Sequence, residues 1–157
     1  MREELLVSVQ DVPVPRSEVF PFFEDPSNLE ALTPPWLSFR ILTPAPLPRG
    51  EGAVYEYRLT VRGLPLRWRT LIEPFEPGRR FVDRQIAGPY ALWHHTHRFE
   101  DLPGGGTRLV DQVRYRVGWG LLGRIAHALW VRRDLERVFA YRREAIAARF
   151  GAAERAA

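Results

Sequence analysis

The chain has 157 residues, a length that suits one globular domain with a hydrophobic core and no need for disulfides. It contains no cysteine, so thiolate catalysis, cysteine-based zinc sites and iron–sulfur clusters are all excluded. All 23 basic residues are arginines, and because 19 acidic residues are interspersed among them, the net charge of +4 does not indicate a nucleic-acid-binding surface.

The first elements are a strand and two short helices. Alternating apolar residues predict a strand over residues 4–15, and Ser17 offers an N-cap for a short helix over residues 18–25. A second short helix begins at Pro26 or Ser27 and is stopped by the Pro-Pro pair that follows it.

Six further segments alternate between polar and apolar residues and are separated by turns rich in glycine and proline. The short connections between them predict an antiparallel meander. The six predicted strands cover residues 36–43, 52–63, 64–75, 79–88, 92–101 and 106–117.

After residue 118 the apolar spacing changes from two to three and four, which predicts one long amphipathic helix over residues 121–150. The arginines of this helix are assigned to the face opposite the apolar one. That apolar face carries Leu122, Ile125, Leu129, Leu135, Val138, Phe139, Ile146 and Phe150. Residues 1–151 are predicted to form a single domain, and residues 152–157 a disordered tail.

No stretch of roughly 18 consecutive apolar residues is present, and the N-terminus lacks the apolar core of a signal peptide. We therefore expect a cytoplasmic protein without an integral membrane segment.

The segment LWHHTHRFED, residues 92–101, contains three of the four histidines of the chain. Since successive side chains of a strand point to opposite faces, His95 and His97 share one face and His94 lies on the other. The first face also carries Trp93 and Phe99, so we assign it to the interior. The same alternation places Tyr55, Tyr57, Trp68, Asp83, Gln85, Asp111 and Tyr115 on the inner faces of the other strands.

The turns predict which of these inner residues are neighbours. If the turns at residues 88–90 and 102–107 close their hairpins symmetrically, Asp83 lies opposite His95 and Asp111 lies opposite His97. A carboxylate beside an imidazole raises the pKa of the histidine, lowers that of the aspartate, and satisfies two groups that are costly to bury alone. The sequence thus predicts a polar band within an aromatic lining.

The order of elements, a strand, two short helices, six strands and a long helix, is that of the helix-grip fold. The stretches DPSNLEALTPPWLSFRI, FVDRQIAGPYALWHHTHRFED and GTRLVDQVRYRV resemble the SRPBCC (START-related) superfamily, which includes polyketide cyclase/dehydrase-like and lipid-transfer proteins. The resemblance covers nearly the whole chain. It implies an α+β fold, in which a curved antiparallel sheet of six to seven strands, two short helices and a long C-terminal helix enclose a ligand cavity.

Three kinds of chemistry fit the polar band. The H-x-H pair could ligate a metal together with Asp83 or Asp111. A histidine paired with aspartate could instead act as general acid or base, with Tyr55 or Tyr115 as a donor to a developing enolate. In the third, the pairs hold the sheet together and offer hydrogen bonds to a polar ligand end. We favour the third, and so assign no catalytic residue, no metal and no cofactor.

The functional hypothesis is binding or transport of a small hydrophobic or amphipathic ligand in an internal cavity. The alternative is a cofactor-free cyclase or dehydratase acting on a polyketide-like or aromatic substrate. Expected partners are this small molecule and, in a homodimer, a second copy of the chain, but not a nucleic acid. The expected ligand-binding residues are Tyr55, Tyr57, Trp68, Asp83, Gln85, Trp93, His95, His97, Phe99, Asp111 and Tyr115.

Overall fold

The computed structural model of the chain describes residues 3–118 and 130–152. Its strands are β1 (Glu4–Val12), β2 (Arg40–Ile41), β3 (Val54–Val61), β4 (Leu64–Glu76), β5 (Arg80–Ala87), β6 (Tyr90–Asp101) and β7 (Thr107–Val117). Its helices are α1 (Arg16–Glu24), the short 3-10 helices η1 (Pro26–Leu29) and η2 (Pro35–Leu37), and α3 (Arg132–Phe150).

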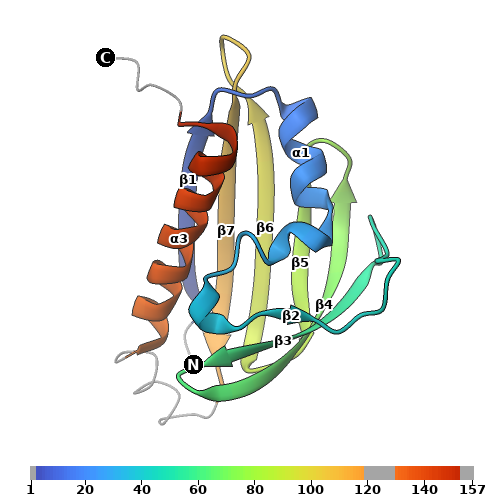
Figure 1. The fold of residues 1–157 in the computed structure, drawn as a ribbon, viewed down its shortest axis with the longest axis vertical. Coiled ribbons are helices and arrows are strands. Elements are labelled where there is room, and N and C mark those ends of the chain that lie inside the picture. Colours follow the sequence, from blue (N-terminus) through green and yellow to red (C-terminus); the bar gives the residue numbers. More distant parts are fainter. Residues whose placement is uncertain (1–2, 119–129, 153–157) are drawn as a thin grey trace.

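All seven strands form one antiparallel sheet in the order β1-β7-β6-β5-β4-β3-β2. From β2 to β7 each strand pairs with its neighbour in sequence, as the predicted meander requires, and β1 closes the sheet beside β7. The sheet is curved, and α1 and α3 lie on the same side of it (Figure 1). The predicted α+β arrangement is confirmed. None of the described helices has both the length and the apolar character needed to cross a bilayer.

Two local predictions differ from the structure near the N-terminus. Ser17 does not cap the first helix, because α1 already begins at Arg16, and the carbonyl of Pro15 accepts the first helical hydrogen bonds. The strand predicted over residues 36–43 is reduced to the two residues of β2. The two prolines before Trp36 start η2 instead, and Ser38 then adopts a left-handed conformation (φ 45°) that interrupts extended structure.

Helix α3 confirms the C-terminal part of the helix predicted over residues 121–150. Residues 119–129, the earlier part of that prediction, lie outside the described residues, as do residues 153–157 of the predicted tail. The buried residues of α3 are Leu135, Phe139, Arg142 and Ile146. Their spacing of three and four defines the face that covers the sheet.

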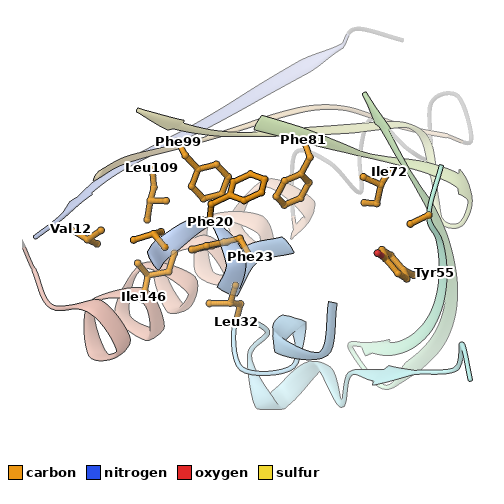
Figure 2. Close-up of a cluster of buried hydrophobic side chains, with 12 residues drawn as sticks. Val12, Phe20, Phe23, Leu32, Tyr55, Ile72, Phe81, Phe99, Leu109 and Ile146 are labelled. Carbon is orange, nitrogen blue, oxygen red and sulfur yellow. The ribbon is translucent and has the colours of Figure 1, made fainter. Parts of the chain in front are cut away.

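One end of the interior is filled by a cluster of apolar side chains between α1, α3 and the sheet (Figure 2). Phe20 of α1 contacts Phe99 edge to face at 5.1 Å and Phe81 at 6.1 Å. Ile146 of α3 is 1% exposed in the same cluster. Each such aromatic pair contributes about 0.5–1.5 kcal/mol beyond the area it buries. This cluster fixes both helices against the sheet and so positions the groups described next.

Candidate ligand-binding site

The centre of the site is the pair of inner histidines on β6, near the middle of the sheet. Strand alternation places His95 and His97 on the concave side, where they are 7% and 5% exposed. In the observed register Asp83 of β5 lies opposite His95, and Asp111 of β7 lies opposite His97. Both pairings are the ones predicted from the hairpin turns, so this prediction is confirmed.

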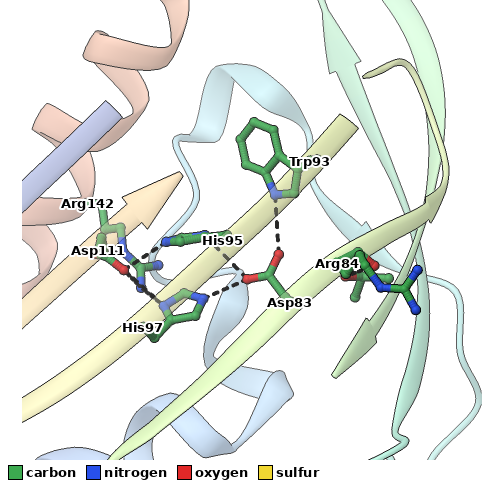
Figure 3. Close-up of polar contacts among 8 residues, drawn as sticks. Asp83, Arg84, Trp93, His95, His97, Asp111 and Arg142 are labelled. Atoms are coloured by element: carbon green, nitrogen blue, oxygen red, sulfur yellow. Dashed lines mark hydrogen bonds and ion pairs between the residues drawn. The ribbon is translucent and has the colours of Figure 1, made fainter. Parts of the chain in front are cut away.

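Each imidazole lies between the two carboxylates (Figure 3). Two hydrogen bonds join residues that are diagonal to each other in the register: His95 Nε2 is 2.9 Å from Asp111 Oδ1, and His97 Nε2 is 2.6 Å from Asp83 Oδ2. The other ring nitrogens are also close to a carboxylate, His95 Nδ1 at 3.3 Å from Asp83 and His97 Nδ1 at 2.9 Å from Asp111. Because the two rings are 3.7 Å apart, these four side chains form one unit, here called the His–Asp cluster.

A buried arginine from α3 completes this cluster. Arg142 is 7% exposed, and its Nε donates to Asp111 Oδ2 at 3.1 Å, while its Nη2 lies 3.4 Å from His97 Nδ1. The assignment of all arginines of the last helix to its solvent face is therefore wrong for Arg142. Its position, three residues after Phe139 and four before Ile146, continues the apolar face, and this spacing is the signal that identifies it.

The charges of the cluster balance if one histidine is protonated. Asp83 and Asp111 contribute two negative charges, and Arg142 contributes one positive charge. A second positive charge on one imidazole brings the sum to zero. Buried charges are costly unless they are compensated. The interior therefore favours the state in which one histidine is an imidazolium and the other is neutral.

Local contacts decide which histidine carries the proton. Burial opposes it, but hydrogen bonds to Asp111 and Asp83 outweigh burial and raise the pKa of His97 above its ordinary value of 6.5. Burial, together with the neighbouring charge of His97, lowers the pKa of His95. Burial would raise the pKa of Asp111, but Arg142 and the two imidazoles hold it well below 3.8. Of the two histidines, His97 is therefore the one that holds the additional proton, and His95 is the one that stays neutral.

Beside the cluster lies an aromatic group on the inner faces of β3, β4 and β6. Trp93 connects the two, since its Nε1 donates to Asp83 Oδ1 at 3.3 Å and its ring lies 5.0 Å from that of Trp68. Trp68 in turn stacks on Tyr57, with ring centroids 6.0 Å apart. Tyr57 and the neighbouring Leu59 face inward but remain partly accessible, as does the side chain of Asp83 (19%). The described residues therefore leave this part of the concave face partly open.

The predicted site residues divide into two groups. The structure brings together Tyr57, Trp68, Asp83, Trp93, His95, His97, Asp111 and Tyr115. Tyr55 and Phe99 instead belong to the apolar cluster around α1, where the Tyr55 hydroxyl donates to the carbonyl of Pro48. Gln85 closes the β5–β6 turn, since its amide bonds both the carbonyl and the N–H of Tyr90. These three residues are therefore placed away from the His–Asp cluster by their own packing and hydrogen bonds.

Tyr90 is a member of the aromatic group that sequence reasoning assigned to a turn. It is the first residue of β6, and the pairing with β7 is irregular between Tyr90 and Leu92. This irregularity turns the Tyr90 ring inward, to 5.5 Å from Trp68 and 4.9 Å from Trp93. Strict alternation along the strand could not reveal it, because a bulge changes which side chains face inward.

Three groups of the cluster, Asp83, His95 and His97, could also hold a metal ion, because their ligand atoms lie within 4.8 Å of one another. If a divalent ion replaced the additional proton of the imidazolium, the ion and Arg142 would together carry three positive charges against the two negative charges of the aspartates. One positive charge would then remain uncompensated. We therefore expect chelation with EDTA to leave the melting temperature of the purified protein unchanged. Stoichiometric zinc or iron in the wild type, lost in His97→Ala but retained in His94→Ala on the outer face of the strand, would contradict this expectation.

An open hollow of about 260 Å³ lies on the surface, apart from the cluster, and is lined by Arg16, Glu76, Arg79, Arg80, Arg98, Phe99 and Glu100. Arg80 and Glu76 form an ion pair there at 2.6 Å, and Arg16 pairs with Asp101 at 2.9 Å. Two of its four arginines are thus paired, and no residue of the His–Asp cluster or of the aromatic group lines this hollow, so the concave face is the better candidate for a ligand.

The chain is similar to proteins of known classification. The family model described as polyketide cyclase/dehydrase and lipid transport matches residues 12–137. No curated protein sequence matches the chain. Among solved structures, protein TTHA0849 from Thermus thermophilus has 18% identity and a TM-score of 0.66, over 93% of this chain and 99% of its own.

Two further structures have the same TM-score of 0.66 over 93% of this chain. They are a START superfamily protein from Mycobacterium smegmatis (13% identity, 96% of its own chain) and the Zhui aromatase/cyclase from Streptomyces sp. R1128 (19% identity, 95% of its own chain). At these identities the likeness to the solved structures concerns the fold alone.

Proposed function

Because the chain belongs to the polyketide cyclase/dehydrase and lipid transport family, we propose that it binds a small hydrophobic or amphipathic ligand against the concave face of its sheet. The observation that carries this proposal is the partly open aromatic group next to a buried, charge-balanced His–Asp cluster. Apolar ligand surface would contact Tyr57, Trp68 and Trp93, and a polar end would lie near the accessible edge of Asp83.

This proposal predicts saturable binding of the uncharged fluorescent probe N-phenylnaphthylamine to the wild-type protein. Trp93→Ala should weaken that binding by about five- to tenfold, since one buried aromatic contact contributes on the order of 1 kcal/mol. Trp36→Ala is the matched control, because Trp36 is 50% exposed and contacts Arg137 and Tyr141 of α3 instead. Fluorescence titration measures both affinities. Absence of binding, or an equal loss in the two variants, would contradict the proposal.

A second function, general base catalysis, is favoured by the geometry of His95. Its Nε2 lies 2.9 Å from Asp111 Oδ1 and its Nδ1 3.3 Å from Asp83 Oδ2, so a neutral ring that donates to the nearer carboxylate has its lone pair on Nδ1. Asp111 is itself held by Arg142, so the orientation of the His95 ring is fixed, as in enzymes that use an aspartate-oriented histidine as a base. Faster cyclisation of a polyketone in the presence of the native protein, lost in His95→Ala, would establish this function in place of simple binding.

A further inference from the structure

The indole N–H of Trp68 is buried without a hydrogen-bond partner. Trp68 is 6% exposed on the inner face of β4, and its Nε1 contacts no acceptor among the residues that the structure describes. The neighbouring Trp93, by contrast, donates its Nε1–H to Asp83. An unpaired buried donor destabilises the folded protein, and native proteins retain few of them. An acceptor from outside the chain would remove this cost.

Two hydroxyl groups belong to rings that contact the Trp68 indole. Tyr57 is its direct partner across the β3–β4 pair, and Tyr90 approaches it edge to face at 5.5 Å. Neither hydroxyl forms a hydrogen bond within the described part of the chain. Burial raises the pKa of both tyrosines, so both remain protonated near neutral pH and can donate. The aromatic group therefore offers three hydrogen-bond donors that are paired with no acceptor among the described residues.

We propose that this group binds the ligand through an uncharged carbonyl oxygen, which accepts a hydrogen bond from Trp68 Nε1. The rings of Tyr57, Tyr90 and Trp93 surround the Trp68 indole, so the matching ligand is a flat, largely apolar ketone. Asp83 lies near Tyr57, and its negative charge disfavours a carboxylate at this position. The inference rests on the proposed function. It adds to that function a ligand class, an apolar ketone, and a specific hydrogen-bond donor, the N–H of Trp68.

Fluorenone and fluorene distinguish recognition of a carbonyl oxygen from binding of an apolar ligand as such. Both probes are flat and tricyclic, and only fluorenone has a carbonyl group. We expect wild-type protein to bind fluorenone about tenfold more tightly than fluorene, as measured by equilibrium dialysis. In Trp68→Phe the ratio should approach one, while the exposed control Trp36→Phe should keep the wild-type ratio. Equal binding of both probes by the wild type would overturn the carbonyl inference and leave the proposed function standing. Binding of neither probe would overturn both.

A ligand-free measurement tests the unpaired donor directly. Trp68→Phe and Trp93→Phe remove the same side-chain volume, but Trp68→Phe removes an unsatisfied N–H and Trp93→Phe removes the donor to Asp83. The urea midpoint should therefore fall less in Trp68→Phe than in Trp93→Phe. An equal or larger fall in Trp68→Phe would mean that the Trp68 N–H is already satisfied in the free protein, and would overturn the inference whatever the probes do.

Discussion

Replacing Arg142 by methionine is expected to lower the free energy of unfolding by about 3–5 kcal/mol, because it leaves a buried carboxylate without its cation. Arg142 is 7% exposed and holds Asp111 at 3.1 Å, and its charge is half of the positive charge that balances the His–Asp cluster. Methionine keeps much of the side-chain volume, so the loss would report the charge rather than a cavity. Urea unfolding followed by circular dichroism measures it.

The matched control for this prediction is Arg132→Met in the same helix. Arg132 forms an exposed ion pair with Glu136 at 3.1 Å, with side chains that are 69% and 56% accessible. Such pairs contribute about 0–1 kcal/mol, so the control should be nearly neutral. If Arg142→Met were as mild as Arg132→Met, the charge balance described for the cluster would be incorrect.

The stability of the protein should depend on pH through both inner histidines, with opposite signs. The pKa of His97 is raised above 6.5 in the folded protein, so its contribution is complete below pH 6.5 and is lost as the pH rises through the raised pKa. The pKa of His95 is lowered, so its contribution is present above pH 6.5 and is lost as the pH falls through the lowered pKa. We therefore expect a stability maximum near pH 6.5.

The steepest slope that one histidine can produce is about 1.4 kcal/mol per pH unit. His97→Gln should abolish the decline of stability on the alkaline side, while His94→Gln, on the outer face of the same strand, should preserve it. Urea unfolding at a series of pH values measures each profile. A wild-type profile without a decline above pH 6.5 would show that His97 does not hold the proton of the cluster.

The sequence predicted the fold and the central pairings because both follow from short-range rules. Period-two alternation identified the inner residues of β6, and compact turns aligned Asp83 with His95 and Asp111 with His97. The diagonal hydrogen bonds could not be derived in the same way. Backbone register places residues opposite one another, whereas the orientation of each side chain decides which ring nitrogen meets which carboxylate.

Arg142 was missed for a different reason. Arginine is mostly exposed in proteins, and sequence reasoning applied that rule to the whole helix, although position 142 falls on the buried face. Only the contact between α3 and β7 shows that Asp111 compensates the charge there. Gln85 shows the reverse case, since a polar inner residue expected near the ligand is used to bond the backbone of Tyr90.

Ligand binding against the concave face is tested most directly by the tryptophan indole signals in proton–nitrogen NMR spectra during titration with N-phenylnaphthylamine. Trp68 and Trp93 are 6% and 9% exposed beside the cluster, whereas Trp36 and Trp130 are 50% and 46% exposed. We predict that the indole signals of Trp68 and Trp93 move with a common saturation curve, while those of Trp36 and Trp130 stay in place. Shifts confined to Trp36 and Trp130, or no shift at all, would contradict an interior ligand site.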